Sequence, residues 1–139
     1  MNNIFLNTIN GNSCHRPPVW FMRQAGRILP SYRKLKESHN FYDMMKDPEL
    51  SSEVTLLPID DLGVDSAILF SDILVIPDAL GLDLIFTKNG PKFTNALNNE
   101  SFNHLKFDSQ KLEYIYTNIE KTVENKKTTP LIGFCGGPL

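Results

Sequence analysis

Apolar residues along the chain gather in short continuous runs, and these runs alternate with segments of helical periodicity. Three runs have the branched and aromatic residues of buried strands, at Val19 to Met22, Asp65 to Phe70 and Leu131 to Phe134. The runs are nearly continuous rather than alternating, which favours burial on both faces, as in a parallel sheet. Strands that alternate with helices predict an α/β fold, in which the carboxyl ends of the strands share one edge.

One helix between these runs has a clear start and a clear end. Asp47-Pro48-Glu49 supplies an acidic N-cap, a proline at the first helical position and a second acid in the first turn. Gly63 is expected to end this helix, and Pro58 to kink it. The residues expected to face the core are Leu50, Val54, Leu57 and Leu62.

A second long helix is predicted from Asp108 or Ser109 to Lys126. Its expected core-facing residues are Leu112, Ile115, Tyr116, Ile119 and Val123. The shorter elements expected are a helix over Ser31 to Glu37 with Ser31 as N-cap, a second short turn over Phe41 to Lys46, a short helix over Ile73 to Leu80, and a strand and hairpin over residues 82–91.

Composition places the chain among globular proteins. Its 139 residues, 41% of them apolar, suit one domain, and a net charge of −2 gives no general surface for nucleic acid. No apolar segment approaches the roughly 20 residues that span a bilayer, so no membrane partner is expected. Two distant cysteines and three scattered histidines match no metal spacing. We therefore expect free thiols, no metal, surface histidines and a cytoplasmic location.

All four arginines of the chain lie in one N-terminal stretch. Arg23 and Arg27 follow the first predicted strand directly, with Gly26 just before the second of them. Because a guanidinium keeps its charge and matches carboxylate geometry, and because glycine lets a ligand approach the backbone, this segment predicts an anion-binding lip. Arg16 and Arg33 are expected on a solvent-exposed surface.

Asp72 follows the second predicted strand and has two interpretations. An aspartate in this position is often the N-cap of the next helix. It can equally direct a carboxylate into a pocket whose other wall is made by Arg23 and Arg27. In a parallel sheet, residues 23–27, 71–72 and 135–138 should converge on one face, because each segment follows a strand.

Several of these segments carry a resemblance to a known family. Pro18-Val19-Trp20-Phe21-Met22-Arg23-Gln24-Ala25-Gly26-Arg27 with Leu29-Pro30 resembles the N-terminal signature of the uroporphyrinogen decarboxylase family. Three further blocks match it in order and spacing: Ala67 to Leu74, Pro77 to Gly81 and Leu131 to Phe134. The resemblance covers nearly the whole chain.

The resemblance implies a (β/α)8 TIM barrel, of which residues 1–139 form the N-terminal part with about three barrel strands. It implies an enzyme of porphyrin and haem biosynthesis that needs no cofactor and is a homodimer at full length. Such an enzyme, a carboxy-lyase, removes the four acetate carboxyls of uroporphyrinogen III to give coproporphyrinogen III.

The resemblance also assigns roles to residues. Arg23, Gln24, Ala25, Gly26 and Arg27 would line the substrate pocket, where the arginines bind substrate carboxylates and one of them is a candidate proton donor. Asp72 corresponds to the central aspartate of the family. Arg27 and Asp72 are therefore the expected catalytic residues, and Phe41 maps to an aromatic residue that lines the pocket.

Length is the main departure from the family pattern. A barrel of this type needs about 250 residues, so we expect an N-terminal fragment that is inactive and prone to associate by itself. One alternative is a non-catalytic fragment that binds porphyrinogens or an enzyme subunit. A more distant alternative is a relative of the corrinoid-linked methyltransferases, although the chain lacks a Cys/His zinc cluster.

Overall fold

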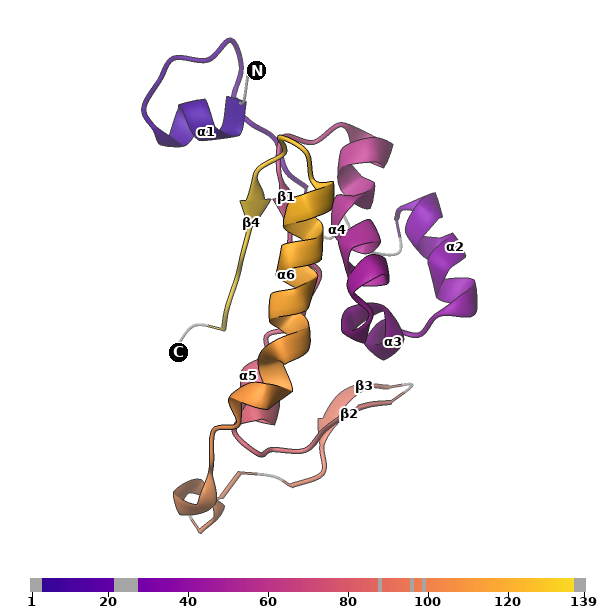
Figure 1. Ribbon diagram of the computed structural model, residues 1–139, viewed down its shortest axis with the longest axis vertical. Coiled ribbons are helices and arrows are strands. Elements are labelled where there is room, and N and C mark those ends of the chain that lie inside the picture. The colour runs from indigo at the N-terminus through magenta and orange to yellow at the C-terminus, as the bar shows by residue number, and fades with distance from the viewer. Residues whose placement is uncertain (1–3, 22–27, 88, 96, 99, 137–139) are drawn as a thin grey trace.

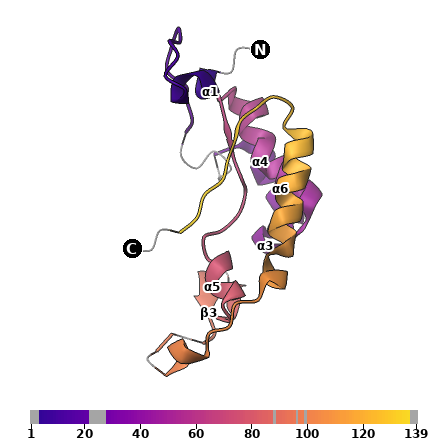
Figure 2. The ribbon, with the colours of Figure 1, turned by 60° about the vertical axis from the view of Figure 1, so that its left-hand side comes forward.

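The computed structural model describes residues 4–21, 28–87, 89–95, 97–98 and 100–136. Two parallel strands, β1 (Ala67–Ile68) and β4 (Leu131–Ile132), carry a layer of helices on one side. That layer contains α3 (Phe41–Lys46), α4 (Pro48–Leu62) and α6 (Glu113–Asn125), with α4 and α6 side by side (Figures 1 and 2). In the described part of the chain, no helix covers the opposite face of the strands (Figure 2).

The remaining elements lie around this layer and at the two ends of the molecule (Figure 1). They are α1 (Ile4–Ile9), α2 (Pro30–Ser38), α5 (Val75–Ala79), β2 (Leu84–Thr87), β3 (Gly90–Phe93) and the 3-10 helices η1 (Ser101–His104) and η2 (Ser109–Leu112). The antiparallel hairpin β2–β3, which the sequence predicted, lies at the end opposite α1 and outside the parallel sheet.

The parallel pairing of β1 and β4 confirms the α/β prediction. Ala67 pairs with Leu131 and Ile68 with Ile132, and the Leu69 N–H donates to the Ile132 carbonyl at 3.0 Å. Both strands are shorter than the runs 65–70 and 131–134 that predicted them. The described residues form a mixed α/β structure with few short strands, and they close no barrel.

The predicted limits of α4 are confirmed. Asp47 caps its start, because the carboxylate accepts the Leu50 N–H at 3.0 Å. Gly63 ends it in the left-handed region with φ of 66°, a conformation that a side chain would strain. Leu62, which was expected in the core, is 43% exposed, since it lies on the last turn beyond the cover of neighbouring helices.

Helix α6 is confirmed with its first turn in 3-10 form at η2, but its buried face differs from the prediction. Tyr116 and Val123 are 55% and 49% exposed, whereas Asn118 and Thr122 are fully buried. The reason is local hydrogen bonding: the Thr122 hydroxyl donates to the Asn118 carbonyl at 2.7 Å, and such bonds let polar side chains face a helix neighbour.

Helix α2 is confirmed, but Ser31 is not its N-cap. The helix begins at Pro30 with Leu29 as the capping residue, and Leu29 makes no side-chain bond there. The Ser31 hydroxyl instead donates to Asp61 of α4 at 3.0 Å. Proline at the first helical position needs no N–H partner, so the helix starts without a capping side chain.

The first predicted strand is wrong over its described residues. Val19, Trp20 and Phe21 form no strand and are 37%, 37% and 56% exposed, and Met22 lies outside the described residues. A run of this composition is buried only where a neighbouring strand and a covering layer are present. Within the described structure, this segment is held by Asp65 and no ladder forms along it.

The core lies between the helices and the carboxyl end of β1. Its buried residues are Leu29, Tyr32, Met44, Met45, Val54 and Phe70. Both cysteines are free thiols, as expected. Among the described residues, no helix is long and apolar enough to cross a membrane.

Candidate functional site

Asp72 lies four residues beyond the end of β1 and is half-buried. One carboxylate oxygen, Oδ1, accepts the Leu74 N–H at 2.8 Å, and the Asp72 carbonyl accepts the Val75 N–H at 3.4 Å. These bonds form a turn before α5, but Asp72 is not the N-cap of that helix, because Leu74 holds the capping position and makes no side-chain capping bond. Within the described residues, the second oxygen, Oδ2, accepts no hydrogen bond. The carboxylate is thus held through Oδ1 by the turn that it forms with Leu74.

Helix α4 fixes the backbone just before Asp72. The Thr55 hydroxyl accepts the Phe70 N–H at 2.9 Å, and it donates to the Ser51 carbonyl at 2.8 Å. The Ser51 hydroxyl donates to the Phe70 carbonyl at 3.4 Å. Both main-chain groups of Phe70 therefore bond to α4 rather than to a strand, which explains why the ladder of β1 ends early.

The ends of β1 and β4 come together, as expected for parallel neighbours. A Cβ atom at Gly136, which follows β4, would lie 3.9 Å from Ile73 Cβ, which follows β1. Gly136, in the predicted segment 135–138, therefore lies close to Ile73, the residue that follows Asp72. The third predicted segment contains the expected substrate-binding residues Arg23 to Arg27, and it lies outside the described residues.

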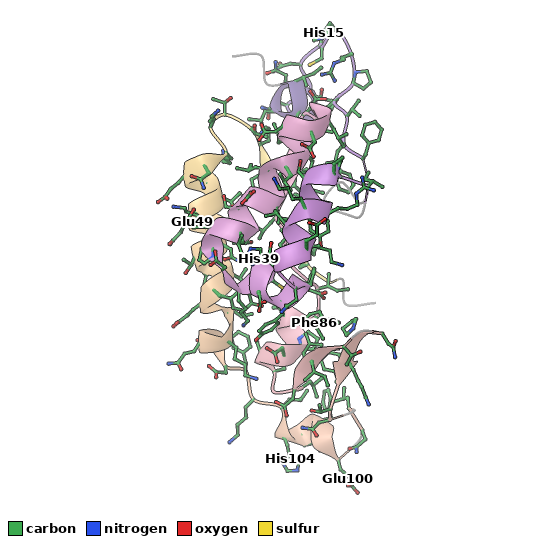
Figure 3. The ribbon with its side chains drawn as sticks, turned by 90° about the vertical axis from the view of Figure 1, so that its right-hand side faces the viewer. His15, His39, Glu49, Phe86, Glu100 and His104 are labelled. Atoms are coloured by element: carbon green, nitrogen blue, oxygen red, sulfur yellow. The ribbon has the colours of Figure 1, made fainter. Side chains whose placement is uncertain are left out.

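Phe41 belongs to an aromatic cluster beneath the end of β1. Its ring packs edge-on against Phe70 with centroids 5.1 Å apart, and it packs against Phe86 at 5.2 Å. Phe86 comes from the hairpin and lies at the hairpin end of the helical layer (Figure 3). Phe41 thus contacts both the end of β1 and the hairpin. Its partner Phe70 is two positions before Asp72 in the chain.

The sequence analysis did not predict a cluster of charged and aromatic side chains next to α5, formed by Lys46, Asp78, Lys111 and Tyr114. The Lys46 ammonium lies 3.5 Å from the centroid of the Tyr114 ring, a cation–π contact. Lys111 donates to the Asp78 carbonyl at 3.0 Å and pairs with its carboxylate at 3.7 Å. Burial lowers the pKa of Lys46, although Asp78 opposes this shift. Spacing in the sequence gives no sign of this cluster, because its members come from α3, α5, η2 and α6.

The Tyr114 hydroxyl also responds to the negative charges near it. Burial is the main cause that raises its pKa, and Asp78, Tyr42 and Asp72 add to the shift. Asp72 therefore contributes to the electrostatic field on this side of the molecule. Tyr114 remains neutral at physiological pH.

The histidines lie far apart from one another (Figure 3). His15 and His104 are exposed near opposite ends of the molecule, and His39 lies between them, partly exposed. No three metal-ligating side chains gather anywhere in the described ranges. Arg33 is exposed as expected. Arg16 is exposed too, with a side chain that is 44% accessible, but it forms an ion pair with Asp65.

Comparison with known proteins adds to this geometry. The family model for uroporphyrinogen decarboxylase matches residues 1–139, the whole chain. The chain belongs to the uroporphyrinogen decarboxylase family. It is 45% identical to a uroporphyrinogen decarboxylase of Sulfurovum sp. (strain NBC37-1) over 99% of this chain and 42% of that protein. It is 46% identical to one of Legionella pneumophila (strain Lens), over 97% of this chain and 40% of the relative.

A uroporphyrinogen decarboxylase of Christiangramia forsetii is 39% identical over 99% of this chain. The chain spans about two fifths of the length of the curated relatives that it matches. The segments on which the resemblance was based, including the one that contains Asp72, all lie inside the matched residues.

Proposed function

We propose that this chain forms part of a uroporphyrinogen decarboxylase, which converts uroporphyrinogen III to coproporphyrinogen III by removing four acetate carboxyls. The observation that carries the proposal is the placement of Asp72. Its carboxylate follows β1, is oriented by one hydrogen bond of 2.8 Å, and keeps the other oxygen free among the described residues. A fixed carboxylate with a free oxygen suits a ligand that bears pyrrole N–H donors.

The whole protein in this proposal is a homodimeric (β/α)8 barrel, with residues 1–139 as the N-terminal portion of its single barrel domain. The parallel pair β1–β4, joined through α6, has the form of two neighbouring barrel strands with their connecting helix. Asp72 and Gly136 would then lie at the carboxyl face, where barrel enzymes have their active sites.

The proposed chemistry starts with proton transfer to the α carbon of the pyrrole ring that neighbours the carbon bearing the acetate arm. The protonated ring accepts the electron pair of the breaking C–C bond, carbon dioxide leaves, and a neutral ring with an exocyclic CH2 group remains. This CH2 group gains a proton and becomes methyl, and the α carbon then releases the proton that it took up first, so the ring is aromatic again. Each arm therefore consumes one proton in total. Because positive charge develops on the ring, the Asp72 carboxylate would stabilise the transition state more than the substrate.

The segment Arg23 to Arg27 completes the proposed site. Its two guanidinium groups would bind the remaining carboxylates of the substrate, and Gly26 would let the substrate approach the backbone. Arg27 is also a candidate donor of the ring proton. Phe41 is proposed to line the pocket from below through its contact with Phe70.

A chimera tests this function. In it, the chain replaces the matching N-terminal part of the Sulfurovum uroporphyrinogen decarboxylase, which is 45% identical over 99% of the chain. Uroporphyrinogen is supplied under anaerobic conditions, and coproporphyrinogen is measured by chromatography after oxidation. Production above that of the relative without its N-terminal part supports the proposal. Substrate binding without turnover would favour a non-catalytic porphyrinogen-binding protein instead.

A further inference from the structure

Asp65, just before β1, holds the segment that leads toward the arginines. Its two carboxylate oxygens each accept a guanidinium N–H of Arg16 at 2.7 Å, the bidentate geometry of a strong pair. Oδ2 also accepts the main-chain N–H of Val19 at 2.6 Å, and the Asp65 N–H donates to the Val19 carbonyl at 3.0 Å. We call these contacts of Arg16, Val19 and Asp65 the Asp65 clamp.

Within the Asp65 clamp, the Asp65 side chain is largely buried, whereas the Arg16 side chain is exposed. Only 10% of the Asp65 side chain is accessible, against 44% for Arg16. The Arg16 hydrogen bonds are the main cause that lowers the pKa of the Asp65 carboxyl, and the Val19 N–H adds to the effect while burial opposes it. An enclosed carboxylate with three N–H donors is a built feature rather than a chance surface pair.

Two prolines make the clamp stiff. Pro17 and Pro18 separate Arg16 from Val19, and neither carries an N–H. The Val19 N–H is thus the first main-chain donor after Arg16, and it goes to the same carboxylate. Arg16 additionally donates to the Pro17 carbonyl at 3.0 Å, which ties its side chain to this turn. Because proline fixes φ, the guanidinium and the Val19 N–H are presented together.

The clamp is one of two anchors around the proposed arginine lip. Val19 lies four residues before Arg23, and on the other side Leu29 follows Arg27 by two. Leu29 is 1% exposed and belongs to the core. The described residues that flank the lip are therefore both held, Val19 by the Asp65 clamp and Leu29 by apolar burial.

We propose that Arg16 and Asp65 are positioning residues for substrate binding, because their clamp sets where the chain toward Arg23 and Arg27 begins. The inference rests on the proposed function. Neither residue touches substrate in this account. Loss of the clamp misplaces the two arginines relative to the substrate carboxylates, and displaced charged groups lose affinity before they lose chemistry.

The test measures KM and kcat for uroporphyrinogen in the chimera and in its variants Arg16→Met, Asp65→Asn and the double variant. Each single change should raise KM about tenfold while kcat changes less than about threefold. The double variant should resemble either single variant, since both remove the same contact. Thermal unfolding is recorded for each protein, and Arg16→Met serves where Asp65→Asn does not fold.

Glu49→Gln is the matched control. It removes one carboxylate charge from a different ion pair, in which Glu49 of α4 lies 2.5 Å from the ammonium of Lys121 of α6. This pair lies in the helical layer (Figure 3). Its KM should stay within about twofold of the parent. Equal KM values for Arg16→Met and Glu49→Gln, or a loss confined to kcat, would overturn the inference. A parent chimera without turnover would contradict the proposed function and the inference together, whereas an active parent with unaffected variants contradicts the inference alone.

Discussion

Thr55→Val is a sharp test of how α4 supports the end of β1. The Thr55 side chain is 1% exposed, and its hydroxyl accepts the Phe70 N–H at 2.9 Å. Valine keeps the shape but removes the acceptor, so the N–H of Phe70, a residue that is 7% exposed, loses its partner. An unpaired buried donor costs about 1–3 kcal/mol, so the free energy of unfolding of the chimera should fall by about 2 kcal/mol.

Thr55→Ser is the matched control, because it keeps the hydroxyl and removes one methyl group. Its loss should be about 1 kcal/mol, from the smaller buried apolar volume. Urea unfolding gives both values, and hydrogen exchange follows the Phe70 amide directly. The amide should lose protection in Thr55→Val and keep it in Thr55→Ser. If Thr55→Val were as stable as the parent with an equally protected Phe70 amide, the assigned hydrogen bond would be wrong.

Three further predictions concern the proposed site and its supports. Asp72→Asn should lower kcat for uroporphyrinogen more than it raises KM, while folding is retained, since asparagine can still accept the Leu74 N–H; near-normal turnover would remove Asp72 from the mechanism. Arg27→Ala should cost about 2–5 kcal/mol in kcat/KM by leaving a substrate carboxylate unpaired, whereas the exposed Arg33→Ala should cost little, and equal losses would contradict the assignment. The pKa of Asp65 is lowered in the folded state, so its contribution to stability is present above the unfolded value of about 3.9 and is lost as pH falls through the folded value. Urea unfolding from about pH 6 to pH 3 should therefore bring the parent toward Asp65→Asn as pH falls, and a constant difference would refute the linkage.

Local signals in the sequence predicted the elements whose causes are themselves local. Asp47 and Gly63 mark the two ends of α4 by a capping bond and a left-handed backbone, and both act within one helical turn. The hairpin β2–β3 follows from a turn sequence between two short runs. Such features depend on few distant contacts, so composition and spacing were enough to find them.

The interface between α4 and α6 was mispredicted because its chemistry is polar. Thr55 and Thr122 are buried in this layer, and each hydroxyl donates to the carbonyl four residues earlier. The Asn118 amide donates to the Met45 carbonyl at 2.7 Å. A periodicity of apolar residues places such side chains on the solvent face, although their partners make burial favourable. Only the fold brings those partners together.

The candidate site was predicted from a different kind of signal. The turn after β1 can be recognised in the order of residues, because Phe70 ends the apolar run and Ser71-Asp72 follows it directly. The Asp65 clamp leaves no such mark, since Arg16 and Asp65 are 49 positions apart and each looks like an ordinary surface charge. Spacing can show that a charged residue follows a strand, but it cannot show which distant charge meets it.

Some apolar residues in the runs that predict strands are exposed, because the described helices cover only one face of the sheet. Phe21 and Phe134 are 56% and 45% exposed, and each belongs to a run that predicts a buried strand. The helices cover one face of β1 and β4, whereas parallel strands in proteins are covered on both faces (Figure 2). The curated relatives carry more than half of their length outside the part that this chain matches. In the proposed barrel, that length supplies the neighbouring strands, so the runs at 19–22 and 131–134 have the composition of strands that the described residues alone do not bury.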